Sequence, residues 1–257
     1  MGKFWSVLFL MVPVFGIGLF FWAPSAGFWL PPDISTHGHD IDHLFNFILV
    51  LTGVVFAATE FSLFWFLWRY DAASNRDPVK YTHGSHHLEV IWTVLPAATL
   101  LFIAIYQMDA WANVKMRMPK DLPPTLEVTA RQFEWRLRYP GPDGKLGTID
   151  DIHHVNDMHI PKDEDVLLDL KSMDVLHDLF LPHLRVKQDA VPGMTIPVWF
   201  RAKEVGTYDL VCAELCGWGH YKMKGRVTIE TRAQYDKWLD EMAANQSATQ
   251  EPAKEEE

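Results

Sequence analysis

The sequence predicts a membrane-anchored α+β protein, in which two or three transmembrane helices precede an extracytoplasmic β-sandwich or barrel. Nearly all long apolar runs lie before residue 110, whereas short alternating runs separated by Pro and Gly follow residue 123. The chain carries 11 Trp and 16 Phe among 257 residues, an aromatic content typical of proteins that meet a membrane interface. Its two cysteines are too few for a fold held together by disulfides.

Three apolar segments have the length of a membrane-spanning helix. They are Phe4–Ala23, Leu44–Trp68 and Val90–Met108, and the only charged residue in them is Glu60. About 20 consecutive apolar residues cross the hydrocarbon core of a bilayer as a helix. We therefore expect a helix over each segment, and the sequence assigns no role to Glu60.

The first segment also has features of a signal peptide, because Lys3 precedes its apolar core. A signal-peptide core usually has about 7–15 residues, and this one is longer. The sequence of residues 23–26, Ala-Pro-Ser-Ala, matches a cleavage site poorly. We expect the segment to be retained as a third helix, and cleavage near residue 26 is the alternative.

The positions of Lys and Arg predict the orientation in the membrane. Arg69, Arg76 and Lys80 lie between the second and third segments, whereas the stretch between the first and second contains acidic but no basic residues. Loops rich in Lys and Arg stay in the cytoplasm. We therefore expect residues 69–88 inside and everything after Met108 outside. This describes a multi-pass protein of the inner or plasma membrane, with its outer domain on the periplasmic face.

Alternating apolar residues predict strands after residue 124. The predicted strands are residues 126–130, 133–139, 166–170, 194–200, 208–211 and 227–229. Strands at this spacing, without a helical period, indicate a sandwich or barrel of about a hundred residues.

The C-terminal part has a different pattern. A helix is expected at residues 234–242, and residues 245–257 are polar and acidic, as in disordered tails. The predicted divisions are an N-terminal segment at 1–30, a transmembrane hairpin at 31–115, the outer domain at 116–232 and a helix with a tail at 233–257.

Metal-ligand residues are concentrated between residues 212 and 223. Two thiols, an imidazole and a thioether occur there, at Cys212, Cys216, His220 and Met223. Soft sulfur ligands with imidazole favour copper or zinc, and a thioether favours copper because Met is a poor zinc ligand. A Cys212–Cys216 disulfide is the alternative, but it closes a very small loop and leaves His220 and Met223 unexplained. We therefore expect a copper site on a loop that follows a strand.

The pattern Cys-x-Glu-x-Cys-x-x-x-His-x-x-Met resembles the copper A loop of cytochrome c oxidase subunit II. Residues 174–177 fit a second pattern of that family, Asp-Val-x-His. The resemblance covers roughly residues 44–229 and implies two membrane helices followed by a cupredoxin-like domain. It also implies subunit I, other oxidase subunits, cytochrome c and membrane lipid as partners. A net charge of −10 argues against a nucleic-acid partner.

The resemblance implies the ligands of a copper A centre. Cys212 and Cys216 would bridge two copper ions, and His177 and His220 would each bind one of them. No catalytic residue is expected in this chain, because oxygen would be reduced in the partner subunit.

Weaker and more distant roles follow from the same resemblance. Met223 and the backbone carbonyl of Glu214 would be weak axial ligands. The Glu214 side chain would reach a magnesium ion shared with subunit I. Residues 89–96 resemble the family pattern Glu-x-x-Trp-Thr-x-x-Pro, in which the Glu lies at the entrance of a proton path. The predicted orientation also places Glu89 on the cytoplasmic side.

Two features depart from the family. The family commonly has Gln-Trp-x-Trp, whose first Trp accepts electrons from cytochrome c, whereas residues 132–135 here are Gln-Phe-Glu-Trp. Phe133 and Trp135 mark the expected region of electron input, and the route and the donor stay open. The loop of residues 140–151 is Gly-rich and acidic but does not match an EF-hand. We expect a solvated turn there, and a calcium site is the alternative.

These expectations describe a subunit through which electrons enter a haem–copper oxidase. It would accept electrons from a c-type cytochrome and pass them to haem in subunit I, where oxygen reduction drives proton pumping. The chain has no Cys-x-x-Cys-His haem attachment sequence, so we expect the donor to be a separate protein. Quinol oxidase subunits lack these copper ligands, and nitrous oxide reductase needs a larger catalytic domain. A copper A subunit of a nitric oxide reductase and a membrane-anchored copper carrier remain as alternatives.

Overall fold

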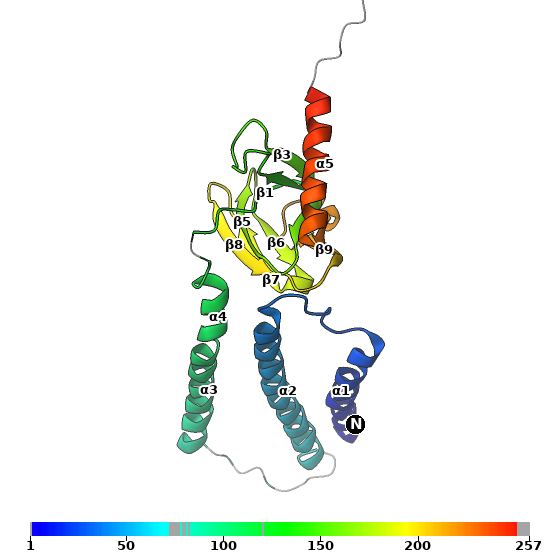
Figure 1. Cartoon of the computed structure of the whole chain (residues 1–257). Helices are drawn as coiled ribbons and strands as arrows, with labels where there is room; N and C mark the ends of the chain where they lie inside the picture. Colours follow the sequence, from blue (N-terminus) through cyan, green and yellow to red (C-terminus); the bar gives the residue numbers. More distant parts are fainter. Residues whose placement is uncertain (1, 72–77, 79–80, 82, 120, 251–257) are drawn as a thin grey trace, which may run out of the picture. The chain divides into compact units, whose positions relative to one another are not determined.

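The structure is a computed structural model that describes residues 2–71, 78, 81, 83–119 and 121–250. The chain forms two compact units, Met1–Leu30 with Asp42–Met108 and Pro31–Ile41 with Asp109–Glu257. The first unit consists of helices, and the second contains the strands and a C-terminal helix (Figure 1). The predicted fold class, apolar helices followed by a β-sandwich, is confirmed.

Long apolar helices form the first unit. They are α1 (Gly2–Trp22), α2 (Gly38–Arg69) and α3 (His86–Tyr106), and all three belong to spans long and apolar enough to cross a membrane. Hydroxyls within the helices donate to the carbonyl four residues earlier, as Thr59 does to Val55 at 2.8 Å. Such bonds pair these hydroxyl donors within the helix, as a hydrocarbon environment requires, whereas Ser6 Oγ in α1 has no hydrogen-bond partner. The three predicted helices are therefore present.

The helix boundaries differ from the predicted ones. The helix α2 begins six residues before Leu44, because its polar first turns give no apolar signal. Its start is held locally, since the N–H of Gly38 donates to the Ser35 hydroxyl at 2.8 Å. Two short elements were not predicted: the 3-10 turn η1 (Ala23–Ala26) and the helix α4 (Met108–Lys115). Arg76 and Lys80, on which the predicted orientation partly depends, lie outside the described residues.

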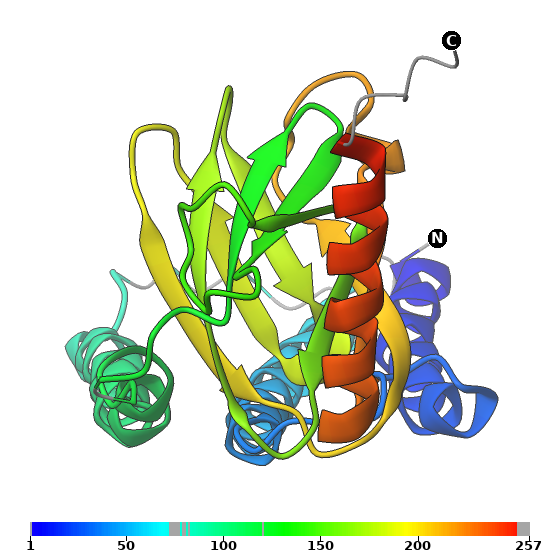
Figure 2. The same cartoon turned by 45° about the horizontal axis from the view of Figure 1, so that its top comes forward.

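Ten strands form two sheets that pack face to face (Figure 2). The first sheet has the order β3-β2-β1-β5-β8, and the second has the order β4-β10-β9-β6-β7. The pairs β1–β5 and β4–β10 are parallel and the other pairs are antiparallel. The strands are β1 (Leu126–Arg131), β2 (Glu134–Tyr139), β3 (Ile152–Val155), β4 (Asp157–Pro161), β5 (Asp165–Ser172), β6 (His177–Leu181), β7 (Val186–Ala190), β8 (Ile196–Arg201), β9 (Gly206–Cys212) and β10 (Lys224–Glu230).

The apolar residues of the alternating runs form the core of the sandwich. Leu126, Val128 and Ala130 of β1 are fully buried, and Leu168 and Leu170 of the adjacent β5 are buried beside them. Side chains alternate between the two faces of a strand, so each run sends every second residue inward. The alternation therefore predicted both the strands and the buried face of the sheet.

Sequence alternation missed four strands. These are β3, β4, β6 and β7, which are only four or five residues long and contain His, Asp, Lys or Gln at many positions. Such strands are specified by the partners they pair with more than by their own composition. Two predicted strands were also wrong at their start, since β8 begins at Ile196 and not at residue 194, and β2 begins at Glu134 and not at residue 133. Phe133 lies in the turn that joins β1 to β2, because the pairing of Arg131 with Glu134 closes the hairpin there.

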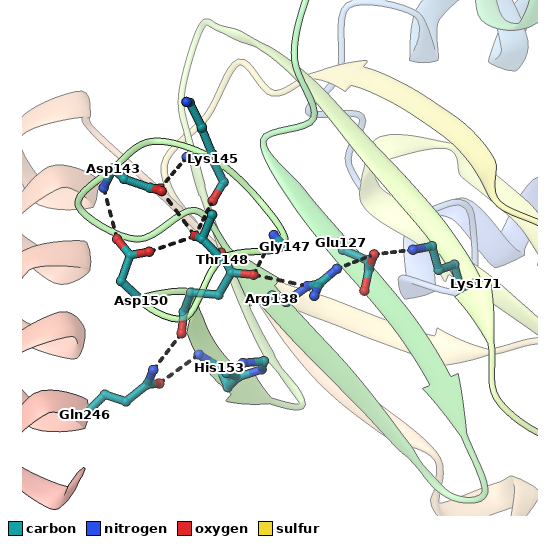
Figure 3. A network of polar contacts seen from close by, with 11 residues as sticks. Glu127, Arg138, Asp143, Lys145, Gly147, Thr148, Asp150, His153, Lys171 and Gln246 are labelled. Atoms are coloured by element: carbon teal, nitrogen blue, oxygen red, sulfur yellow. Dashed lines mark hydrogen bonds and ion pairs between the residues drawn. The ribbon is translucent and has the colours of Figure 1, made fainter.

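The C-terminal helix α5 (Arg232–Gln250) is longer than predicted. Residues 245–250 are helical, which contradicts the disorder expected for them, and residues 251–257 lie outside the described part. The amide of Gln246 donates to the Asp151 carbonyl at 2.6 Å and accepts from the His153 N–H at 3.0 Å (Figure 3). These bonds tie the last turns of the helix to β3, a constraint that local composition does not reveal.

The acidic loop of residues 140–151 is closed by its own polar groups (Figure 3). The Thr148 hydroxyl lies 2.7 Å from one oxygen of Asp150, and the Asp143 N–H donates to the other at 3.0 Å. The Gly147 N–H donates to Asp151 at 2.7 Å. In the described part of the chain, the only group of three His, Cys, Asp or Glu side chains with the spacing of a metal site is His177, Cys212 and Cys216, which lies outside this loop. These contacts close the loop as a hydrogen-bonded turn, and the expected solvated turn without calcium stays a prediction.

Candidate metal centre

Two neighbouring strands bring the candidate ligands together. His177 is the first residue of β6 and Cys212 is the last residue of β9, and the antiparallel pairing aligns Leu179 with Cys212. The chain then forms a loop and the 3-10 turn η3 (His220–Lys222), and Met223 follows immediately before β10. The Cys212 N–H donates to the Met223 carbonyl at 3.1 Å and closes the base of this loop.

The donor atoms converge on a small volume. The Sγ atoms of Cys212 and Cys216 are 3.9 Å apart. His177 Nδ1 lies 3.9 Å from Cys212 Sγ, and His220 Nδ1 lies 3.6 Å from Cys216 Sγ. Met223 Sδ lies 3.7 Å from Cys216 Sγ. Each sulfur therefore has an imidazole nitrogen within 3.9 Å.

The residues present fit copper. Cys212 and Cys216 are free thiols, and their sulfurs are much farther apart than the roughly 2.05 Å of a disulfide bond. His177, Cys216 and Met223 have 0%, 3% and 1% of their surface exposed. The Glu214 carbonyl oxygen lies 3.2 Å from Cys212 Sγ, while the Glu214 residue is exposed. Two thiols, two imidazoles and a thioether make a soft donor set that suits copper better than a hard cation.

The two thiols differ in acidity. Burial opposes the ionisation of Cys212, but hydrogen bonds from His177 and from backbone groups lower its pKa to about 6. Burial, together with the neighbouring Cys212 charge, raises the pKa of Cys216 to about 11. The pair therefore releases its first proton readily and its second with difficulty. A bound cation would stabilise both as thiolates.

Asp174 fixes the orientation of the His177 ring. Its Oδ1 lies 2.8 Å from His177 Nε2, so that Nδ1 faces the sulfurs. The carboxylate also accepts from the N–H groups of Gln132 at 2.8 Å and Val175 at 2.7 Å. Although burial opposes it, these bonds lower the pKa of Asp174. An ionised carboxylate behind a ligand histidine is a common arrangement in metal sites, because it sets the tautomer and the basicity of the ring.

The other predicted residues have different places. Trp135 is fully buried, with its ring centroid 6.3 Å from that of His177. Phe133 is half-buried, and its ring meets that of Trp218 edge to face at 5.6 Å. Glu89 belongs to the helical unit, in the first turn of α3, with an exposed side chain.

Sequence reasoning assigned no role to three residues of the site. They are Asp174, Gln132, whose side-chain amide donates to the Cys216 carbonyl, and Trp218. Asp174 precedes His177 by three positions, a spacing that was available as a signal. Trp218 stands between two glycines in the ligand loop.

Comparison with known proteins identifies the family. Residues 23–109 match "Cytochrome C oxidase subunit II, transmembrane domain", and residues 136–230 match "Cytochrome C oxidase subunit II, periplasmic domain". The chain is 31% identical over 239 residues to alternative cytochrome c oxidase subunit 2 of Bradyrhizobium diazoefficiens, with 84% of each chain covered. It is 26% identical over 273 residues to cytochrome c oxidase subunit 2 of Thermostichus vulcanus, with 85% of this chain and 80% of that one covered.

A solved structure is similar to half of this chain. It is the periplasmic domain of subunit II of cytochrome oxidase of Bradyrhizobium japonicum, with 25% identity and a TM-score of 0.44, covering 50% of this chain and 98% of that one. The two family matches fall on the helices and on the sandwich, so the protein is anchored in a membrane and its sandwich lies outside the cytoplasm. The chain therefore belongs to the cytochrome c oxidase subunit II family, as an oxidase subunit with a cupredoxin-like outer domain.

Proposed function

We propose that electrons enter a haem–copper oxidase through this chain. A binuclear copper A centre between the two cysteines would accept them from a c-type cytochrome and pass them to haem in subunit I. Oxygen reduction and proton pumping would occur in that partner. The observation that carries the proposal is the pair of free, buried thiols 3.9 Å apart, each with an imidazole nitrogen within 3.9 Å.

The residues of this chain would hold the metal as follows. Cys212 and Cys216, as thiolates, would hold two copper ions together with His177 and His220. When bound, copper supplies a one-electron redox couple. Strand ends and backbone hydrogen bonds hold the four side chains in place, so little rearrangement is needed when the charge of the site changes.

Three further roles are part of the proposal. Met223 and the Glu214 carbonyl would add two weaker ligands, since Met223 Sδ lies 3.7 Å from Cys216 Sγ and the Glu214 oxygen lies 3.2 Å from Cys212 Sγ. The exposed Glu214 side chain would be free to reach a magnesium ion shared with subunit I. Glu89, exposed at the first turn of α3, would stand at the entrance of a proton path into subunit I.

The two alternatives are less well supported. A copper carrier needs accessible, labile thiols, whereas Cys216 is 3% exposed and is covered by Met223. The relatives reported above are named cytochrome c oxidase subunit 2, which favours an oxidase over a nitric oxide reductase subunit.

Copper counting with electron paramagnetic resonance tests the proposal. The full chain, purified in detergent and loaded with copper, should bind two copper ions and give a seven-line mixed-valence signal. Cys216→Ser should abolish that signal, and Met173→Leu, a methionine change at an exposed position, should leave it intact. A single copper with a four-line signal in the native chain would reject the binuclear centre and favour a carrier.

A further inference from the structure

Trp218 is exposed in the loop that carries the copper ligands. It lies two residues after Cys216 and two before His220, and 81% of its surface is exposed. Leu215 and Tyr221 in the same segment are 75% and 73% exposed. Contiguous patches of exposed apolar side chains often mark protein interaction sites. This one is built from the same short stretch of chain as the metal site.

Phe133 lies beneath this loop and supports it. A Cβ atom on Gly219 would come within 2.5 Å of the Phe133 ring, and one on Gly217 within 3.3 Å. The ring therefore packs against the backbone on both sides of Trp218, and it also meets the Trp218 ring edge to face at 5.6 Å. Phe133 is half-buried by these contacts, so Trp218 is the more exposed of the two aromatic rings.

We propose that Trp218 is the contact through which the donor cytochrome docks and its electron enters this chain. The inference rests on the function proposed above and names the residue that performs the first step. One electron leaves the ferrous haem of the donor, which becomes ferric, and it reduces the oxidised copper centre. No proton or bond is exchanged. Trp218 offers a short covalent route, since one glycine separates it from Cys216 and another separates it from His220.

The chemistry of the surface defines the partner that fits it. Lys222 Nζ lies 6.0 Å from the centre of the Trp218 ring and 5.4 Å from that of Tyr221. The contact is therefore apolar and aromatic, and the Lys222 cation lies near both rings. It suits a c-type cytochrome whose haem edge is surrounded by apolar side chains. Buried Trp residues are frequent hot spots of protein interfaces, so one side chain can supply much of the docking energy.

The test uses the assembled oxidase and compares single variants by two readouts. The first readout is the second-order rate of electron transfer from reduced cytochrome c, measured by stopped flow. The second is the dissociation constant for zinc-substituted cytochrome c, which cannot donate an electron from iron. Trp218→Ala should lower the rate and weaken the binding by about tenfold or more, as expected for an interfacial hot spot. Because the change removes no charge, the salt dependence of the rate should keep its slope.

Controls separate docking from damage to the metal site. Trp111→Ala removes another exposed indole, on α4, and should change neither readout by more than about twofold. The copper signal and the rate with hexaammineruthenium(II), which needs no protein docking, should stay unchanged in Trp218→Ala. If that variant does not assemble, Trp218→Gln is expected to give the same loss.

The outcomes distinguish this inference from the proposed function. A native chain without the mixed-valence signal would overturn the function and the inference together. A native signal combined with a Trp218→Ala rate within twofold of the native rate would overturn the inference alone. A tenfold loss in Phe133→Ala, with no loss in Trp218→Ala, would assign electron input to Phe133 instead.

Discussion

The Phe133 ring touches the backbone of Gly219 so closely that no side chain fits between them. A Cβ atom on Gly219 would come within 2.5 Å of Phe133 Cδ2. These residues are 86 positions apart in the sequence, yet their contact sets the height of the ligand loop above the sandwich. The loop geometry therefore depends on a glycine that is itself no ligand.

Gly219→Ala should disturb the copper centre. The φ of Gly219 is −90°, which alanine adopts freely, so the expected effect is a steric one from Phe133. Overpacking of this kind typically lowers the free energy of unfolding by about 1–3 kcal/mol. We expect a lower melting temperature and an altered copper spectrum. The double variant Gly219→Ala/Phe133→Ala should recover part of the melting temperature and of the native copper spectrum. If the destabilisations of the two single variants simply added in the double variant, a direct clash between the residues would be contradicted.

Asp174→Asn should weaken copper binding. The substitution removes the charge that orients the His177 ring while keeping the size of the side chain. Loss of such a partner typically costs about 10–100-fold in metal affinity. Competition with a chelator measures the change. Asp143→Asn, in the surface loop of residues 140–151, should leave the affinity unchanged, and an equal loss in both variants would show a general effect of charge.

The stability of the outer unit should fall as the pH drops below about 6.5, in part through His37. Burial against Trp199 lowers the pKa of His37, and Arg201 acts in the same direction while Asp40 and Asp165 oppose it. The unfolded chain therefore binds a proton more readily, so acid favours unfolding. Thermal melts between pH 5 and 8 should show a flatter profile for His37→Gln. An unchanged profile would show that other groups carry the dependence.

Trp238→Ala should release α5 from the sandwich. The Trp238 ring stacks on His159 at 4.0 Å with an interplanar angle of 5°, and it meets Tyr139 edge to face at 5.1 Å. Because Trp238 is only half-buried, we expect the free energy of unfolding to fall by about 2–3 kcal/mol, below the 3–5 kcal/mol typical of a fully buried Trp. Chemical denaturation measures the loss. In contrast, the exposed Trp111→Ala should cost less than about 0.5 kcal/mol.

The sequence by itself determined the features that depend on short stretches of chain. Three membrane helices follow from the length of the apolar runs, and several strands follow from alternation, as in Leu126–Ala130. The candidate ligands Cys212 to Met223 lie within twelve positions, so their spacing alone pointed to a metal loop. His177 was added through its resemblance to a family pattern, since no local spacing connects it to the cysteines.

Only the tertiary structure decided which distant residues meet. The short polar strands β6 and β7 form because partners are available beside them, and the last turns of α5 persist because Gln246 is bonded to β3. The turn between β1 and β2 packs against the ligand loop 84 residues away. As a result, Phe133 lies beneath the loop, whereas Trp218 stays exposed on it. Composition and periodicity describe neighbours along the chain, whereas these contacts arise when two sheets close on a common core.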